Sequence, residues 1–121
     1  MAVYKLKRIY EQVSKDDGLR VLVDRLWPRG IRKDKVDFWL KEIAPSAELR
    51  KWFHHEGGKF AGFAKAYQAE LAQNSAVIEL RKLAREHKTV TLLYAARDMN
   101  SNHAVILKKY MEGKRIKRLT D

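Results

Sequence analysis

The sequence contains no cysteine, and this absence removes several classes of protein at once. A disulfide framework, a thiolate zinc site, an iron–sulfur cluster and a cysteine nucleophile all require that residue. No apolar run approaches the roughly 20 residues that a membrane-spanning helix needs. The first residues, MAVYKLKRIY, lack the apolar stretch of a secretory signal. We therefore expect a cytoplasmic protein that has no contact with a membrane.

Acidic residues are scarce relative to basic ones. Lysine and arginine total 26 against 15 aspartates and glutamates, which gives a formal net charge of +11. Such a surface attracts polyanions and speeds their arrival, so a nucleic acid or a phosphorylated ligand is one interpretation. The other interpretation is a solvated basic surface that keeps a small protein soluble. Charge alone does not choose between these two.

Proline is also rare, and neither of the two prolines separates domains. Pro28 and Pro45 both lie within well-patterned segments, and we find no repeat or linker. A chain of 121 residues that is 45% hydrophobic has the size and composition of one domain with its own core. We expect a single domain over residues 1–113, followed by a basic tail over residues 114–121 that frays from it.

Three segments have the composition of β-strands. Residues 3–10 alternate loosely and carry lysines, which favours a strand at the edge of a sheet. Residues 19–26 are rich in leucine and valine, and residues 89–96 form an apolar run typical of a strand covered on both faces. The polar turn over residues 11–18 is short for a crossover, so the first two strands are either antiparallel or joined by an unusual connection.

Helical spacing fills most of the rest of the chain. Apolar residues at i, i+4 and i+7 predict a helix over residues 36–43, which Pro45 ends. A second helix follows with Ser46 as its N-cap, and the remaining helices are predicted over residues 60–71, from Asn74 or Ser75 to about residue 84, and over residues 103–112. The order predicts an α/β fold: a single layered domain with helices packed on a small, at least partly parallel sheet of three or four strands.

A candidate site follows from the loops at the ends of two predicted strands. Residues 24–30 (DRLWPRG) and 94–98 (YAARD) are charged and structurally unusual. If the two strands are parallel, both loops lie at the carboxyl edge of the sheet, where open α/β sheets bind ligands. The last predicted helix also begins there, so its first N–H groups are available to an anion.

The side chains of these loops suit an anionic ligand. Arg25, Arg29 and Arg97 offer forked donors to a phosphate or carboxylate. Trp27 and Tyr94 offer an apolar wall or a surface on which a base stacks. The structural alternative is that Trp27 covers the core and that the arginines close loops through ion pairs with neighbouring aspartates.

Three residues are candidates for catalysis. Asp24 or Asp98 could orient an arginine, bind a metal or act as a base, and His103 could exchange protons near neutral pH. Each has a structural alternative as well, because ion pairs and helix caps use the same residue types. The gathering of polar and aromatic residues at one edge favours function for the group as a whole.

The motifs of known chemistry are absent. His54 and His55 are adjacent, so on a helix their side chains point about 100° apart and do not share a metal ion. Gly57 and Gly58 follow a helix and lack the spacing of a nucleotide-binding loop, and no nucleophile elbow is present. We therefore predict no metal site, and the sequence names no cofactor.

Five segments, taken in order, resemble one family. They are VDRLWPRG, LKEIAPSAELRKWFHH, the F-x-x-F-x-x-x-Y-x-x-EL pattern, TLLYAARD and NHAVILKKY. The chain resembles the YeaO-like family of bacterial proteins (domain of unknown function 488) over nearly its whole length. The resemblance implies a small α/β domain in the bacterial cytoplasm, and it brings no established activity, substrate or catalytic residue. The matching motif residues are Asp24, Arg25, Trp27, Pro28, Arg29, Gly30, Pro45, Ser46, Trp52, Tyr94 and His103.

Three functional hypotheses stay open at this point. The first is an enzyme or sensor that binds a small phosphorylated or carboxylated ligand through Arg25, Arg29 and Arg97. The second is a nucleic-acid-binding module that uses the basic surface, and the third is a structural or protein-interaction domain. The sequence gives neither the reaction type nor the oligomeric state.

Overall fold

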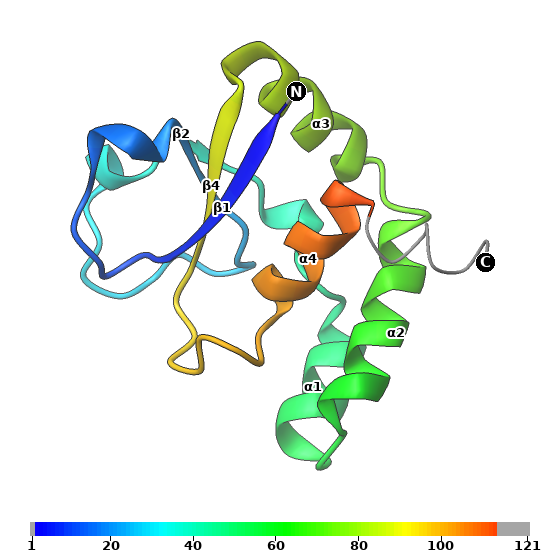
Figure 1. Cartoon of the computed structure of the whole chain (residues 1–121). Helices are drawn as coiled ribbons and strands as arrows, with labels where there is room; N and C mark the ends of the chain where they lie inside the picture. Colours follow the sequence, from blue (N-terminus) through cyan, green and yellow to red (C-terminus); the bar gives the residue numbers. More distant parts are fainter. Residues whose placement is uncertain (1, 114–121) are drawn as a thin grey trace.

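Four parallel strands form the sheet in the computed structural model, which describes residues 2–113 (Figure 1). They are β1 (Val3–Arg8), β2 (Leu19–Leu22), β3 (Phe38–Trp39) and β4 (Thr89–Tyr94), and their spatial order is β1-β4-β2-β3. The predicted α/β class with a small parallel sheet is confirmed. The predicted basic tail over residues 114–121 lies outside the described residues.

Strand β4 lies at the centre of the sheet, between the two strands that come first in the sequence. Its Leu92 is aligned with Leu6 of β1 and with Val21 of β2, and both pairings are parallel. The predicted edge position of the first strand is confirmed, whereas the antiparallel alternative for the first two strands is wrong. They do not pair with each other, because β4 separates them and the segment 9–18 crosses over it.

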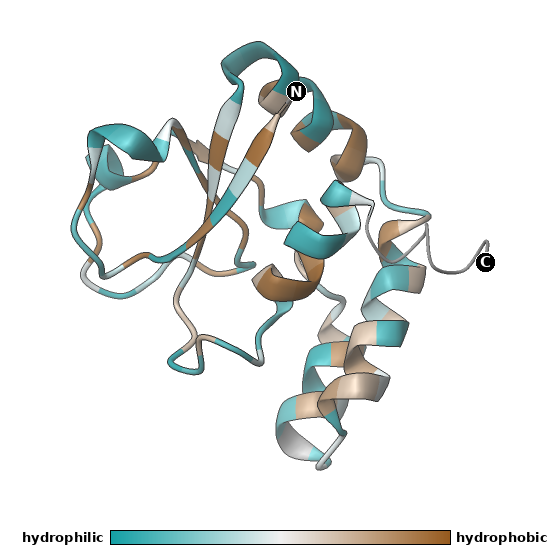
Figure 2. Cartoon of the chain, in the orientation of Figure 1, coloured by the Kyte–Doolittle hydropathy of each residue, from teal (hydrophilic) through white to brown (hydrophobic). Residues whose placement is uncertain are grey.

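The helices cover one face of this sheet (Figure 1). They are α1 (Ala47–His55), α2 (Phe60–Leu71), α3 (Ala76–His87) and α4 (His103–Glu112). Helix α4 packs on β1 and β4, α2 packs on α4, and α1 packs on α2. Figure 2 shows apolar residues on the strands and on the first turns of α4, where the main core lies. None of the helices within residues 2–113 is long and apolar enough to span a membrane.

The prediction of a helix over residues 36–43 is wrong. This stretch contains the short strand β3 between two 3₁₀ turns, Lys33–Lys35 and Lys41–Ile43. The backbone of Asp37 donates to Arg20 O, and the N–H of Leu40 donates to Leu22 O, so the stretch extends the sheet. A strand alternates its side chains between two faces, and spacing of apolar residues alone does not distinguish it from a short helix.

Helix α1 begins at a cap that a second helix reinforces. The Ser46 hydroxyl oxygen accepts from the N–H of Leu49 at 3.1 Å and donates to Glu70 of α2 at 2.6 Å. The other carboxylate oxygen of Glu70 accepts from the Ser46 N–H at 2.9 Å. The cap predicted at Ser46 is therefore present, and it also joins α1 to α2.

Replacing this cap is expected to destabilise the protein. Ser46→Ala removes both hydroxyl contacts, and we expect a loss of about 1–2 kcal/mol in the free energy of unfolding, measured in urea. Ser75→Ala is the matched control, because Ser75 precedes α3 without a side-chain cap hydrogen bond. The two variants should therefore differ, and equal stabilities would show that the cap at Ser46 contributes nothing.

Loops rather than helices cover the other face of the sheet. Ile9, Leu22 and Leu93 form a small buried cluster there. Trp27, Ile31 and Val36 pack against it from the segment between β2 and β3. This arrangement fixes the start of the loop that follows β2, which carries several of the predicted site residues.

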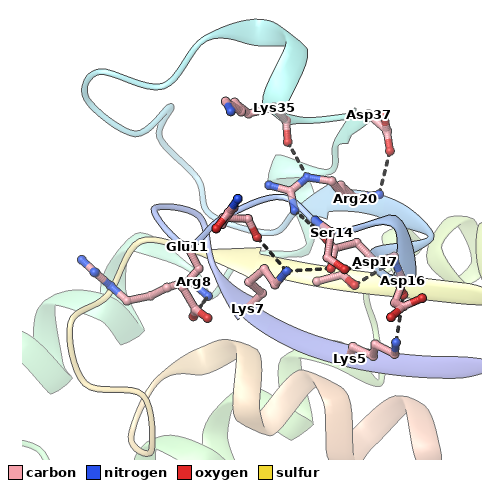
Figure 3. Close-up of polar contacts among 12 residues, drawn as sticks. Lys5, Lys7, Arg8, Glu11, Ser14, Asp16, Asp17, Arg20, Lys35 and Asp37 are labelled. Carbon is pink, nitrogen blue, oxygen red and sulfur yellow. Dashed lines mark hydrogen bonds and ion pairs between the residues drawn. The ribbon is translucent and has the colours of Figure 1, made fainter.

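A buried polar cluster holds these loops to the sheet (Figure 3). Asp17 is only 4% exposed, and its carboxylate oxygens lie 2.7 Å from Lys7 Nζ and 2.5 Å from Arg20 Nη1. Burial alone would raise the pKa of Asp17, but hydrogen bonds from Lys7, the Ser14 N–H and Arg20 outweigh it and hold the pKa below its ordinary value. The guanidinium of Arg20 also donates through Nε to Lys35 O at 2.8 Å.

Candidate functional site

The ends of β2 and β4 lie side by side at the carboxyl edge of the sheet. The Val23 N–H donates to Leu93 O at 3.1 Å, and the Ala95 N–H donates to the Asp24 carboxylate at 3.0 Å. The two loops singled out in the sequence therefore leave the sheet next to each other. Both strands end earlier than predicted, because Asp24 binds the neighbouring loop with its side chain instead of continuing the ladder.

A cavity of about 420 Å³ opens at this edge, and we call it the edge cavity. The loops after β1, β2 and β4 contribute to its walls, together with helices α1 and α2 and the start of α4. Its lining residues are Tyr10, Asp24, Arg25, Leu26, Trp27, Pro28, Arg29, Ala44, Pro45, Arg50, Phe53, His54, Phe63, Ala95, Ala96, Ser101, Asn102 and His103.

Asp24 and His103 form a pair in the wall of the edge cavity. His103 Nε2 lies 3.2 Å from Asp24 Oδ1 and 3.1 Å from Val23 O. Both neighbours accept hydrogen bonds, so we assign the ring proton to Nε2. The ring of Tyr67 meets the imidazole edge-on at 6.2 Å. The position and tautomer of His103 are thus set by Val23 and Asp24, the two residues that follow β2.

Three guanidinium groups also line the edge cavity. Arg25 is half-buried and makes only long contacts, at 3.4 Å to Glu42 Oε1 and 3.4 Å to Ala44 O. Arg50 donates through Nε to Pro45 O at 3.3 Å. The side chain of Arg29 is exposed and has no hydrogen-bond partner within residues 2–113. Asp24 contributes the sole carboxylate among the lining residues that the structure describes. The cavity wall therefore carries an excess of positive charge.

Comparison with known proteins places this chain in a family. A family model described as "Inactive DUF488-N3 subclade" matches residues 3–119. The chain belongs to this family. It is 47% identical over 109 residues to the uncharacterized protein YeaO of Escherichia coli. The aligned region covers 87% of this chain and 93% of that protein. It is 46% identical over 112 residues to the uncharacterized protein Rv3073c of Mycobacterium tuberculosis, covering 91% and 94% respectively. No solved structure matches the chain.

The resemblance inferred from the motifs of this DUF488 chain is confirmed, and several of the motif residues meet in one place. Five residues predicted for the site line the edge cavity: Asp24, Arg25, Trp27, Arg29 and His103. They come from the loop after β2 and from the first turn of α4, as the parallel arrangement requires.

Three other predicted site residues lie away from the edge cavity. Tyr94 is 2% exposed and packs in the main core, where burial raises its pKa. Arg97 is exposed and is not among the lining residues. Asp98 shapes its own loop, because one carboxylate oxygen accepts from the N–H groups of Asn100 and Ser101 at 2.9 and 3.0 Å.

Helix α1 supplies residues that the sequence interpretation missed. Arg50, Phe53 and His54 line the edge cavity and are spaced i, i+3 and i+4, so they share one face of the helix. That spacing was the available signal. The same spacing is typical of a helix face packed in the core, so by itself it does not indicate a cavity wall.

Arg8 is a further residue that sequence interpretation did not single out. Its guanidinium donates through Nε to Ala96 O at 2.9 Å and through Nη2 to Ala95 O at 3.2 Å. These contacts hold the segment after β4 against the end of β1.

Among residues 2–113, no group of three or more histidine, aspartate or glutamate side chains is arranged to hold a metal ion.

Proposed function

We propose that this protein binds a small anionic ligand, phosphorylated or carboxylated, in the edge cavity. The observation that carries the proposal is the charge of the wall. Arg25, Arg29 and Arg50 face a cavity whose one described carboxylate, Asp24, already lies beside His103. Guanidinium groups in such a position favour planar, forked binding of a phosphate or carboxylate.

The existing contacts of these arginines leave their donors available. Hydrogen bonds at 3.3–3.4 Å, such as those of Arg25 and Arg50, are at the long end of the range and are weak. The contact of Arg25 with Glu42 is an ion pair, but the Glu42 side chain is 69% exposed, so exchanging it for a ligand anion costs little. Ordinary ligand pockets have volumes of roughly 300–1,000 Å³, and the edge cavity falls within that range.

The shape of the site supports a small ligand in preference to a nucleic acid. A nucleic acid is bound across an extended basic surface that follows its phosphates, whereas these arginines surround a hollow. A second hollow lies at the amino edge of the sheet, beside Arg81, Arg85 and Lys88. All three of those side chains are exposed, and that hollow has no half-buried arginine of the kind that Arg25 provides in the edge cavity.

Binding without turnover is the form of the proposal that the family supports. The matching subclade is described as inactive. In that case Asp24 and His103 have a structural role in the cavity wall. The Asp24 carboxylate accepts a hydrogen bond from the Ala95 N–H, and His103 Nε2 donates one to Val23 O. A binding role requires no proton transfer from either residue.

Phosphate is expected to raise the melting temperature of the protein, and Arg25→Ala is expected to weaken this effect. A ligand at 100 times its dissociation constant stabilises the folded state by about 2.7 kcal/mol. Loss of charge-assisted hydrogen bonds from Arg25 should raise the dissociation constant by roughly 10- to 100-fold. The measurement is thermal unfolding across a phosphate titration at constant ionic strength.

Arg97→Ala is the matched control, because Arg97 follows the same strand end yet lies outside the cavity wall. It should respond to phosphate as the wild type does. Phosphate also stabilises proteins without binding, by exclusion from their surface. The proposal therefore fails if wild type, Arg25→Ala and Arg97→Ala all gain the same stability.

A further inference from the structure

We infer that the ligand of the edge cavity carries an aromatic ring beside its anionic group. This inference rests on the proposed function and concerns the same site. The first observation is size: the cavity is about 420 Å³, a volume typical of pockets for drug-sized molecules. An inorganic phosphate ion would leave most of that volume empty, so the anionic group is one part of a larger ligand.

The second observation is that the wall includes four aromatic side chains. Tyr10, Trp27, Phe53 and Phe63 all line the edge cavity. They come from the loops after β1 and β2 and from helices α1 and α2, so rings reach the cavity from separate parts of the fold. Aromatic side chains favour offset or edge-to-face contact with another ring, which an aliphatic group does not reproduce.

The rings on the helix side are held in place before any ligand arrives. The rings of Phe53 and Phe63 stack on each other with their centroids 4.4 Å apart. Phe63 is also stacked with Tyr67, at 6.1 Å, in the main core. A wall fixed in this way loses little conformational freedom on binding, which favours affinity.

The rings on the loop side are fixed by polar contacts. Trp27 donates from its indole nitrogen to Ile31 O at 2.8 Å and meets the Trp39 ring edge-on at 5.3 Å. The Tyr10 hydroxyl donates to Arg29 O at 3.1 Å, and the Arg8 guanidinium lies 5.0 Å from the centre of its ring. Tyr10 thus joins the aromatic wall directly to a residue that carries one of the cavity's charges.

The combination indicates an aryl phosphate or aryl carboxylate as the ligand class. The arginines bind the anionic group, and the ring contacts the aromatic wall. Phenyl phosphate, inorganic phosphate, cyclohexyl phosphate and benzyl alcohol separate these two contributions. We expect calorimetric titration of the full chain to give a dissociation constant for phenyl phosphate at least tenfold below those of inorganic and cyclohexyl phosphate. Benzyl alcohol, which lacks the charge, should bind more weakly than phenyl phosphate by at least the same factor.

Tyr10 offers a variant that tests the aromatic wall without disturbing the core, because its side chain is 48% exposed. Tyr10→Leu is expected to reduce the preference for phenyl over inorganic phosphate at least threefold. Tyr10→Phe removes the hydroxyl but keeps the ring and its contact with the Arg8 guanidinium, so it should retain the preference.

The outcomes distinguish this inference from the proposed function. Equal binding of phenyl, cyclohexyl and inorganic phosphate would overturn the inference and leave the anion site standing. The anion site would be overturned if benzyl alcohol bound as tightly as phenyl phosphate. It would also be overturned if none of the three phosphates bound.

Discussion

Asp17→Ala is expected to destabilise the protein by about 3–5 kcal/mol, the cost of leaving a buried charge without its partner. Arg20 is 5% exposed, and its Nη2 already lacks a hydrogen-bond partner within residues 2–113. Without Asp17, its guanidinium keeps the single contact to Lys35 O. Lys7 loses its carboxylate partner as well. Urea unfolding measures the loss, which corresponds to a fall of about 10–20 °C in melting temperature for a domain of this size.

Asp16→Ala is the control for this prediction, because the Asp16 side chain is exposed and its neighbour Lys5 binds the backbone oxygen instead. That variant should stay within about 0.5 kcal/mol of wild type.

The pKa of Asp17 is depressed in the folded state, so its contribution to stability is present above the unfolded pKa, about 3.9, and is lost as the pH falls through the folded value. Asp17→Ala should therefore lose less stability on acidification than wild type. A variant of near wild-type stability would show that the cluster is not needed for folding.

Gly18→Ala is expected to cost about 3–5 kcal/mol, from backbone strain and steric overlap together. Gly18 has φ +64°, a conformation that side chains disfavour. A Cβ there would lie 2.3 Å from Thr89 O, which is backbone at the start of β4. Relief would require moving β2 away from β4, the pair that brings the site loops together. Urea unfolding of the variant measures this cost.

Gly30→Ala separates the two contributions. Gly30 has φ +78°, but a Cβ there would meet no atom within 4 Å. It should therefore show the strain alone, about 1–2 kcal/mol. If Gly18→Ala proved no more costly than Gly30→Ala, the close approach of β2 and β4 at Thr89 would be contradicted.

Much of the candidate site could be predicted from the sequence, because it depends on topology more than on side-chain detail. The apolar run of β4 indicated a buried strand, and such strands are usually parallel. Parallel strands place their following loops at one edge, so Asp24 and His103 meet although they are far apart in the sequence. No side-chain orientation had to be known for that step.

Tyr94 and Arg97 were predicted for the site but lie outside the edge cavity, and the local sequence pattern does not contain the information that places them there. Both faces of β4 are apolar, so the sequence does not show that Val90, Leu92 and Tyr94 face the main core while Leu93 faces the loops. Arg97 lies in a loop whose direction after Ala96 is set by tertiary contacts, including those from Arg8.

The error over residues 36–43 has a related cause. Val36 packs on the loop side of the sheet and Leu40 on the helix side. Residues four apart would share one face of a helix, so these positions are not helical. In the sequence alone, the same residues fit helical spacing. The pairing of Leu40 with Leu22 decided between the two structures, and that pairing joins segments distant in sequence.

The binding of an anion at the carboxyl edge is tested most directly by a ¹H–¹⁵N NMR titration of the full chain with phosphate. We expect the largest amide shifts in the loop around Arg25, at Ala95 and in the first turn of α4 from His103. Shifts centred instead on Arg81, Arg85 and Lys88 at the amino edge, or no saturable shifts anywhere, would contradict an anion site in the edge cavity.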